Sequence, residues 1–214
     1  MSKKYEIFLF DLDGTITDSA LGITNSVMYA LKKFGIEETD RTKLYKFIGP
    51  PLTESFEKFY GFTKEQSLDG VKYYREYYHD KGIYENRVYD GLEEVLKKIN
   101  EAGKQAIVAT SKPEKYAKII IDHFHLTKYF ACVAGMEMDG GRGTKAQVIT
   151  YALEKNDITD KSNVLMIGDR EHDVIGAHEN GLDCLGILYG FGSRKEFEEA
   201  GADYIRENVE DILQ

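Results

Sequence analysis

The sequence is poor in cysteine, in positive charge and in long apolar runs. Its two cysteines, Cys132 and Cys184, are too few for a disulfide framework and belong to no Cys-x-x-Cys pair or His/Cys metal cluster. They indicate core thiols in the reducing cytoplasm. Lys and Arg total 28 against 37 Asp and Glu, a formal net charge of −9, which argues against binding to nucleic acid polymers. No stretch approaches the ~18 apolar residues of a membrane span, so no membrane partner is expected.

Size and composition indicate a globular protein with one main core. The chain has 214 residues, which at about 150 per domain allows one core and a smaller appendage. Hydrophobic residues make up 42% and charged residues 30%, which excludes a disordered chain. The segment 1–4, which contains two lysines, precedes a short apolar run that ends at Asp11. A signal peptide would stay apolar there, so this run is typical of a first strand.

Five short apolar runs predict strands of a parallel sheet. Most are apolar at consecutive positions, which is typical of strands buried on both faces by helices. Amphipathic segments separate the later runs, and two of these segments begin with capping-box patterns, Asp90 with Glu93 and Ser193 with Glu196. The expected fold is α/β with a Rossmann-like parallel core. The predicted strands are residues 5–10, 105–110, 131–134, 163–167 and 183–188.

The interval from about 18 to 86 departs from this alternation, because its pattern is helical and contains no convincing strand. Gly35 is expected to end its first helix, and Gly49 with the two prolines after it to interrupt another. Thr63 and Gln66 predict the start of a third helix. We therefore expect an inserted helical domain.

Two pairs of acidic residues directly follow predicted strands. Asp11 and Asp13 come after the first strand, and Asp169 and Asp173 follow the run 163–167. An Asp-x-Asp pair alone is common in loops, but ligands of open α/β sheets bind at the carboxyl ends of strands. If the two strands are neighbours, three or four carboxylate oxygens converge, and Mg²⁺ prefers such ligands.

Two further segments add polar groups to the same sheet edge. A third strand ends in Thr110 and Ser111, which supply a hydroxyl and backbone donors, and Lys145 lies before the next predicted helix, at the end of the glycine-rich stretch 140–145. This stretch is not a P-loop, because Thr144 occupies the place of the glycine that must precede the lysine.

Taken in order, these residues resemble the four motifs of the haloacid dehalogenase superfamily. The match is carried by Asp11 and Asp13 in Asp-Leu-Asp-Gly-Thr, by Thr110, by Lys145, and by Gly-Asp169 with Asp173. Within the superfamily the chain is similar to the phosphoglycolate phosphatase-like subgroup with a helical cap. The resemblance implies a Rossmann-like catalytic core of residues 1–16 and 86–214 and a cap of residues 17–85.

The resemblance also implies a division of labour among the acids. Asp11 is expected to be the nucleophile that forms an aspartyl-phosphate, and Asp13 the general acid and base. Mg²⁺ is the expected cofactor, held by Asp11, the backbone carbonyl of Asp13 and Asp169, with Asp173 ordering its outer shell.

Substrate binding is assigned in the same way. Thr110, Ser111 and Lys145 are expected to bind the phosphoryl group. Gly49 lies in a segment that resembles the cap loop of this subgroup, and the cap is expected to close over the site and contact the organic part of the substrate. Arg170 and His172 fit either a substrate contact or a helix start.

The residues also distinguish among alternative activities. Dehalogenases lack the second aspartate, so Asp13 disfavours that chemistry. A β-phosphoglucomutase-like enzyme typically has a histidine where this chain has Ile23, which favours transfer to water but leaves a phosphomutase open. A non-catalytic Mg²⁺-binding phosphoryl acceptor would not need Asp13 or a cap. We expect a cytoplasmic phosphatase, monomeric or homodimeric, that hydrolyses a small phosphorylated metabolite, phosphoglycolate ahead of nucleoside monophosphates.

Overall fold

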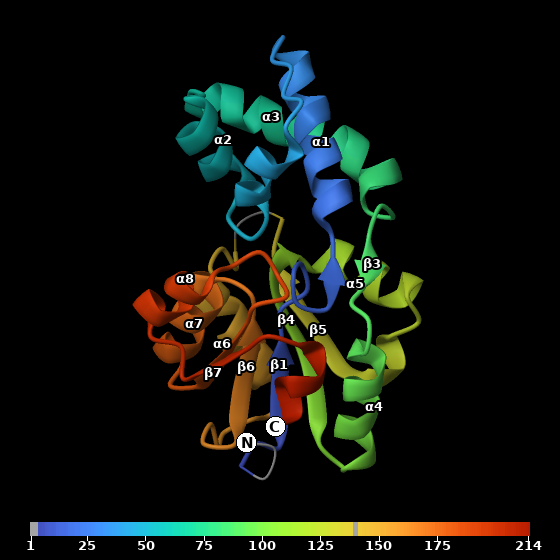
Figure 1. Ribbon diagram of the computed structural model, residues 1–214, viewed down its shortest axis with the longest axis vertical. Helices are drawn as coiled ribbons and strands as arrows, with labels where there is room; N and C mark the ends of the chain where they lie inside the picture. The colour runs from blue at the N-terminus through green and yellow to red at the C-terminus, as the bar shows by residue number, and fades with distance from the viewer. Residues whose placement is uncertain (1–3, 139–140) are drawn as a thin grey trace. The chain divides into compact units, whose positions relative to one another are not determined.

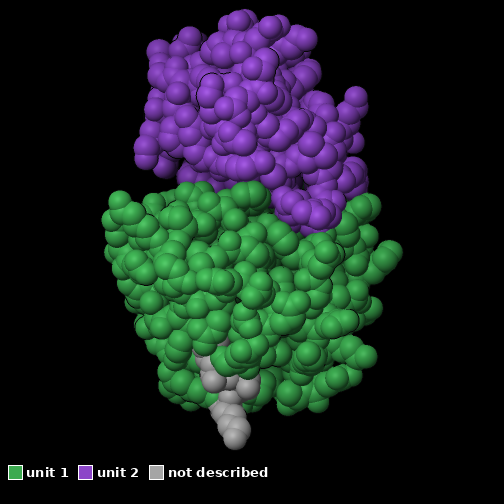
Figure 2. Space-filling view, in the orientation of Figure 1, with its two compact units in different colours: residues 1–17, 88–214 green, residues 18–87 purple. Residues whose placement is uncertain are grey.

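The computed structural model describes residues 4–138 and 141–214. The chain forms two compact units, one comprising residues 1–17 and 88–214 and the other Asp18–Arg87 (Figure 2). The second unit is inserted into the first, directly after the segment that carries Asp11 and Asp13.

The larger unit is built on a parallel sheet, as expected (Figure 1). In the described part of the chain the sheet has six strands in the order β5-β4-β1-β6-β7-β8. All five predicted runs form strands. The edge strand β8 was not predicted, because it is only three residues long and partly exposed throughout. The strands are β1 (Ile7–Phe10), β4 (Gln105–Pro113), β5 (Phe130–Met136), β6 (Val164–Gly168), β7 (Asp183–Ile187) and β8 (Tyr204–Arg206).

The strand order places β1 at the centre of the sheet. Phe10 at its end is in register with Val108 of β4 on one side and with Ile167 of β6 on the other. From β1 the chain goes to β4 and then outward to β5, and returns to place β6 on the opposite side of β1. Open α/β sheets bind ligands outside the carboxyl ends of their strands at such a reversal, which here corresponds to the ends of β1, β4 and β6.

Helices cover both faces of the sheet (Figure 1). On one face, α6 (Lys145–Lys155), α7 (Glu171–Glu179) and α8 (Arg194–Ala200) pack in one hydrophobic cluster with strand residues such as Leu9 and Met166. On the other, α4 (Leu92–Glu101) contacts β4, and α5 (Glu114–His123) contacts β4 and β5. Burial on both faces explains why the strands are apolar at consecutive positions.

The starts of the helices only partly follow their sequence signals. The helix start expected at Thr63 and Gln66 is confirmed: these residues form a capping box that begins α3 (Lys64–Tyr77). The box expected at Asp90 is wrong: Gly91, with φ 82°, is the N-cap of α4 and no side chain caps that helix. Ser193 caps α8, but Oε1 of Glu196 does not complete the box because it accepts hydrogen bonds from Nε of Arg170 and the N–H of Glu171.

The smaller unit is helical, as expected. It contains α1 (Ala20–Lys33), the 3₁₀ segment η1 (Arg41–Phe47), α2 (Leu52–Tyr60), α3 and the π-helical turn η2 (Tyr78–Gly82). Gly35 follows α1 with φ 75°, in agreement with its predicted role. The two passages of the chain between the units, β2 (Thr17–Asp18) and β3 (Arg87–Val88), pair in a two-stranded sheet.

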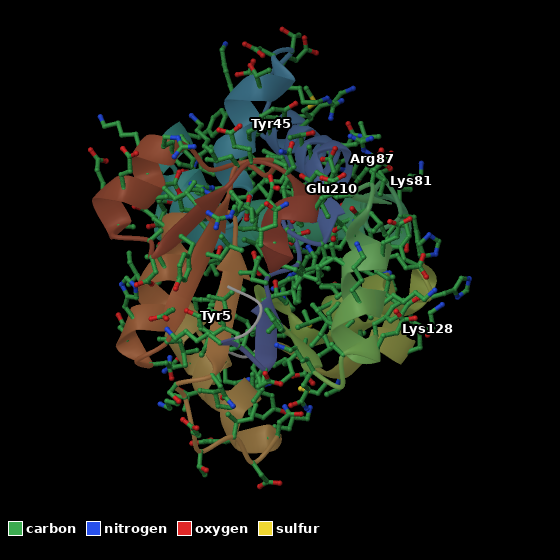
Figure 3. The ribbon with its side chains drawn as sticks, turned by 60° about the horizontal axis from the view of Figure 1, so that its bottom comes forward. Tyr5, Tyr45, Lys81, Arg87, Lys128 and Glu210 are labelled. Carbon is green, nitrogen blue, oxygen red and sulfur yellow. The ribbon has the colours of Figure 1, made fainter. Side chains whose placement is uncertain are left out.

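The amino end of the main sheet is fastened by a tyrosine pair. Tyr5, which precedes β1 (Figure 3), is fully buried and donates a hydrogen bond to the carboxylate of Asp183; its hydroxyl also lies 3.1 Å from that of Tyr204. Both partners belong to the adjoining strands β7 and β8, so this network ties the start of the chain to the sheet. None of the described helices is long and apolar enough to cross a membrane.

Candidate active site

The carboxyl ends of β1, β4 and β6 bring the predicted site residues together. Asp11 follows β1 and its backbone N–H donates to the carbonyl of Ile167 in β6, at 2.9 Å. Thr110 lies in β4, and Asp169 directly follows β6. All of these residues belong to the larger unit, so the main chain of three adjacent strands fixes their spacing.

Lys145 joins two of the acids. Its Nζ lies 2.7 Å from Oδ1 of Asp11 and 2.7 Å from Oδ1 of Asp173, and it donates to the carbonyl of Ala109 at 2.9 Å. Burial by itself would lower the pKa of Lys145, but the charges of Asp11 and Asp173 raise it above its ordinary value. The ammonium is therefore charged at neutral pH and lies beside the carboxylate of Asp11.

Asp169 is the most enclosed of the four acids. It is fully buried, its Oδ2 accepts a hydrogen bond from the N–H of Phe191 at 2.8 Å, and its Oδ1 has no hydrogen-bond partner among the described residues. Burial, followed by the charges of Asp173 and Asp11, raises the pKa of Asp169 well above its usual range. An ionised carboxylate in this position needs a nearby cation.

Three glycines allow the chain to close around Asp169. A Cβ on Gly14, Gly190 or Gly192 would overlap with atoms of Asp169. Gly14 also adopts φ 84°, a conformation that favours glycine. The segment Gly190 to Gly192, which also supplies the N–H of Phe191, was not predicted, since nothing in the sequence relates this loop to the acid after β6.

The acids suit a divalent metal ion. Ligand oxygens of Asp11, Asp169 and Asp173 all lie within 4.8 Å of one another, and Oδ1 of Asp169 is buried without a partner among the described residues. Burial raises the pKa of Asp173 as well, although the ammonium of Lys145 acts in the opposite direction. Clustered carboxylate oxygens without sulfur or imidazole are the ligands of hard ions such as Mg²⁺.

The side chain of Asp13 lies outside this metal cluster. Its Oδ2 is 2.6 Å from Nζ of Lys112, while its Oδ1 is buried and has no hydrogen-bond partner in the described part of the chain. The carboxylate is thus paired with a cation on one side and unpartnered on the other. Any contribution of Asp13 to a metal site would have to come from its backbone carbonyl, as the resemblance implied.

Lys112 is a buried site residue that the sequence did not reveal. It lies two positions after Thr110, and its side chain is 6% exposed. Thr110 is buried, and its Oγ1 accepts a hydrogen bond from the N–H of Lys112 at 3.2 Å. Ser111 between them is half-buried. The one available signal was its place two residues after Thr110, in the polar end of the strand.

Other predicted residues lie elsewhere. Gly49, with φ 103°, belongs to the helical unit, and Gly140 of the glycine-rich stretch is outside the described residues. Arg170 is the N-cap of α7 and its Nε donates to Glu196 at 2.9 Å, which agrees with the helix-start alternative. His172, in the first turn of that helix, is partly buried.

Comparison with known proteins indicates the same family as the residues at these strand ends. Residues 8–187 match the family model described as haloacid dehalogenase-like hydrolase. A solved structure described as a predicted phosphatase from Clostridium acetobutylicum is 48% identical, with a TM-score of 0.94 over 98% of this chain and 97% of that one. The 5'-nucleotidase of Pseudomonas aeruginosa is 45% identical over 193 residues, which cover 90% of this chain and 87% of the relative.

Two other named relatives are less similar. The tyrosine-protein kinase PtkA of Mycobacterium tuberculosis is 35% identical over 188 residues, 87% of this chain, but the match spans only 63% of that protein. A phosphoglycolate phosphatase of Vibrio parahaemolyticus is 22% identical over 98% of this chain and 95% of its own length. The resemblance drawn from the four motifs is confirmed: the chain belongs to the haloacid dehalogenase-like hydrolase family and is one of its phosphatases.

Proposed function

We propose that the protein is a cytoplasmic, Mg²⁺-dependent phosphatase that hydrolyses a small phosphate monoester through an aspartyl-phosphate on Asp11. The observation that carries the proposal is the buried group of Asp11, Asp169 and Asp173 with Lys145 at the carboxyl ends of three adjacent strands. A nucleophile, a phosphate-binding cation and ligands for a metal ion are present there in one place. The two free cysteines are consistent with a reducing compartment.

Charge explains why the site needs a metal ion. The site contains four carboxylates, those of Asp11, Asp13, Asp169 and Asp173. Two ammonium groups, those of Lys112 and Lys145, are paired with them, so negative charge is in excess. A phosphate dianion beside a carboxylate is repelled by about 4 kcal/mol per pair of unit charges at 4 Å with an effective dielectric constant of 20. When bound, Mg²⁺ held by Asp11 and Asp169 with Asp173 beside it would offset this repulsion and polarise the phosphoryl oxygens.

The chain's own residues supply the rest of the reaction. An oxygen of Asp11 attacks phosphorus while the bond from phosphorus to the leaving oxygen breaks, and Asp13 gives a proton to that oxygen. Lys145 offsets charge on the phosphoryl group, and Thr110 and Ser111 donate hydrogen bonds to it. Water then attacks the aspartyl-phosphate, Asp13 takes its proton, and inorganic phosphate leaves with Asp11 restored.

Nucleoside 5'-monophosphates are the first candidate substrates. The relative named 5'-nucleotidase is 45% identical to this chain, whereas the relative named phosphoglycolate phosphatase is 22% identical. This reverses the order in which sequence reasoning ranked the two substrates. The helical unit is assigned the selection of the organic group, with Gly49 and its loop as the first residues to vary. Ile23, in place of a mutase histidine, supports water as the final acceptor.

The test is release of inorganic phosphate from a panel of nucleoside monophosphates, phosphoglycolate, sugar phosphates and pyrophosphate, compared by kcat/KM. Activity should vanish on treatment with EDTA and return with Mg²⁺. Asp11→Asn should abolish turnover of every substrate while the fold, followed by circular dichroism, stays intact. Asp122→Asn, at an exposed position of α5, is the matched control and should be fully active. Retained turnover in Asp11→Asn would contradict the covalent route.

A further inference from the structure

Lys112 is the buried charged residue of the site that the proposed reaction does not yet use. It is 9% exposed as a whole residue, and its Nζ lies 2.6 Å from Oδ2 of Asp13. The second lysine of the site, Lys145, contacts Asp11 and Asp173 instead. Each lysine is therefore paired with a different chemical group: one with the nucleophile, the other with the acid.

The end of β4 places Lys112 by an irregularity of the sheet. Thr110 is in register with Gly135 of β5, but the next pair joins Pro113 to Met136, so β4 has two extra residues, Ser111 and Lys112. Such bulges redirect side chains at the edges of sheets. The N–H of Lys112 is held by Oγ1 of Thr110. A Cβ on Gly135 would overlap with the carbonyl oxygen of Lys112, so β5 packs directly against the irregular segment.

The contact fixes one oxygen of Asp13 and leaves the other one unused. Oδ2 is paired with Lys112, and Oδ1 is buried without a hydrogen-bond partner among the described residues. A carboxylate without the lysine could rotate and exchange its two oxygens. With the lysine in place, a single oxygen is left to exchange a proton with a ligand, and its direction is set by β4.

We propose that Lys112 is a positioning residue that holds Oδ2 of Asp13 and thereby directs Oδ1 to the leaving oxygen of the substrate. This inference rests on the proposed function, in which Asp13 is the general acid. Lys112 acts through Asp13, so its contribution matters most where proton transfer to the leaving group is required, and it affects binding of the phosphate little.

The leaving group separates this role from substrate binding. A nucleoside 5'-monophosphate has a poor alkoxide leaving group that must be protonated, whereas p-nitrophenolate leaves without help. Lys112→Met should lower kcat for the nucleotide by about 10- to 100-fold, a part of what general acid catalysis contributes, and lower kcat for p-nitrophenyl phosphate by less than about 3-fold. KM should stay close to the wild-type value for both substrates. Lys112→Arg keeps the charge and should recover part of kcat for the nucleotide.

A double-mutant cycle with Asp13→Asn completes the test. If Lys112 acts through Asp13, adding Lys112→Met to Asp13→Asn causes no further loss. The inference would be overturned if the losses in kcat of the two single variants multiplied in the double variant, or if Lys112→Met raised KM and left kcat unchanged. Either result would show that Lys112 binds the substrate itself. Lys118→Met, at an exposed lysine of α5 paired with Glu114, is the control and should match the wild type.

The cycle also distinguishes the two proposals. Equal losses for both leaving groups in Asp13→Asn would remove the acid role of Asp13 and with it the role of Lys112, whereas retained turnover in Asp11→Asn would remove the proposed function itself. A leaving-group effect in Asp13→Asn that is absent from Lys112→Met would remove only the role of Lys112. If Lys112→Met does not fold, as judged by circular dichroism, Lys112→Arg carries the same comparison. Its longer planar group shifts Asp13 and should still lower kcat for the nucleotide more than for p-nitrophenyl phosphate.

Discussion

Nζ of Lys145 lies 2.7 Å from Oδ1 of Asp11 and 2.7 Å from Oδ1 of Asp173. Lys145 is the first residue of α6, and its ammonium contacts Asp11 after β1 and Asp173 in the first turn of α7, so one side chain joins motifs from three parts of the chain. Its charge is maintained by the acids, since they raise its pKa although the side chain is buried. The same contact gives Lys145 two effects, on stability and on catalysis.

Lys145→Met should therefore reduce both kcat and the melting temperature. Without the ammonium, Asp11 and Asp173 repel each other and the phosphoryl group, so kcat should fall by about 10²- to 10³-fold, as for the loss of one oxyanion-stabilising donor. The melting temperature without Mg²⁺ should also fall, because buried charges lose their partner. Phosphate release and thermal unfolding measure the two effects. Lys155→Met, in the last turn of the same helix, should leave kcat unchanged.

Mg²⁺ should stabilise the protein more at neutral pH than at pH 5. Without a divalent cation the folded-state pKa of Asp169 is raised, so its contribution to stability is fully present below the unfolded-state pKa and is lost as pH rises through the folded value. Mg²⁺ binds the ionised form and reverses this loss. The melting temperature with and without Mg²⁺, recorded from pH 5 to pH 8, measures the difference. A Mg²⁺-induced shift that shrinks as pH rises would contradict the metal site.

Asp169→Asn should separate stability from activity. The amide removes a buried carboxyl group whose Oδ1 has no hydrogen-bond partner among the described residues, so this variant should melt at a higher temperature than the wild type at pH 7 without Mg²⁺. It should also lose its response to Mg²⁺ and its phosphatase activity. A variant that is less stable than the wild type under these conditions would show that Asp169 is satisfied by the protein alone.

Gly14→Ala tests whether the loop must close on Asp169. Gly14 and Gly103 both have positive φ, 84° and 72°, but a Cβ on Gly14 would overlap with Asp169 whereas one on Gly103 meets no atom within 4 Å. Both alanine variants should lose about 1 kcal/mol or more to backbone strain. Only Gly14→Ala should also weaken the Mg²⁺ dependence of activity, measured by titration. Equal Mg²⁺ requirements in the two variants would show that the close approach of Gly14 has no functional role.

Much of the fold could be predicted because its signals are local. Strands buried on both faces are apolar at consecutive positions, and five of them were recognised on that basis. The edge strand Tyr204–Arg206 was missed because its three residues are all partly exposed. The expected cap at Asp90 failed because Gly91 can adopt φ 82° and begins the helix itself. Both errors lie where tertiary context decided between conformations that the local sequence allows.

The acids of the site were predictable for a similar reason, since all of them lie within five residues of the end of β1 or β6. Lys112 was not, because its direction depends on the register between Thr110 and Gly135 of a different strand. The N–H of Phe191, which binds Asp169, comes from a loop after β7 that no motif marks. Contacts that depend on register or on loop closure join residues far apart in the chain, and neither periodicity nor spacing records them.

Thr144→Ala should lower activity, whereas the equivalent loss of a helix cap in Thr63→Ala should not. Thr144 and Thr63 each form a complete capping box, with Gln147 and Gln66 respectively, and loss of such a cap destabilises a helix by about 1 kcal/mol. Lys145 directly follows Thr144, so fraying of the first turn of α6 displaces the ammonium from Asp11. Thr144→Ala should therefore lower kcat several-fold, whereas Thr63→Ala should lower stability alone. Thermal unfolding and kcat of the two variants measure this, and equal kcat values would mean that the contacts of Lys145 with Asp11, Asp173 and Ala109 hold it without the cap.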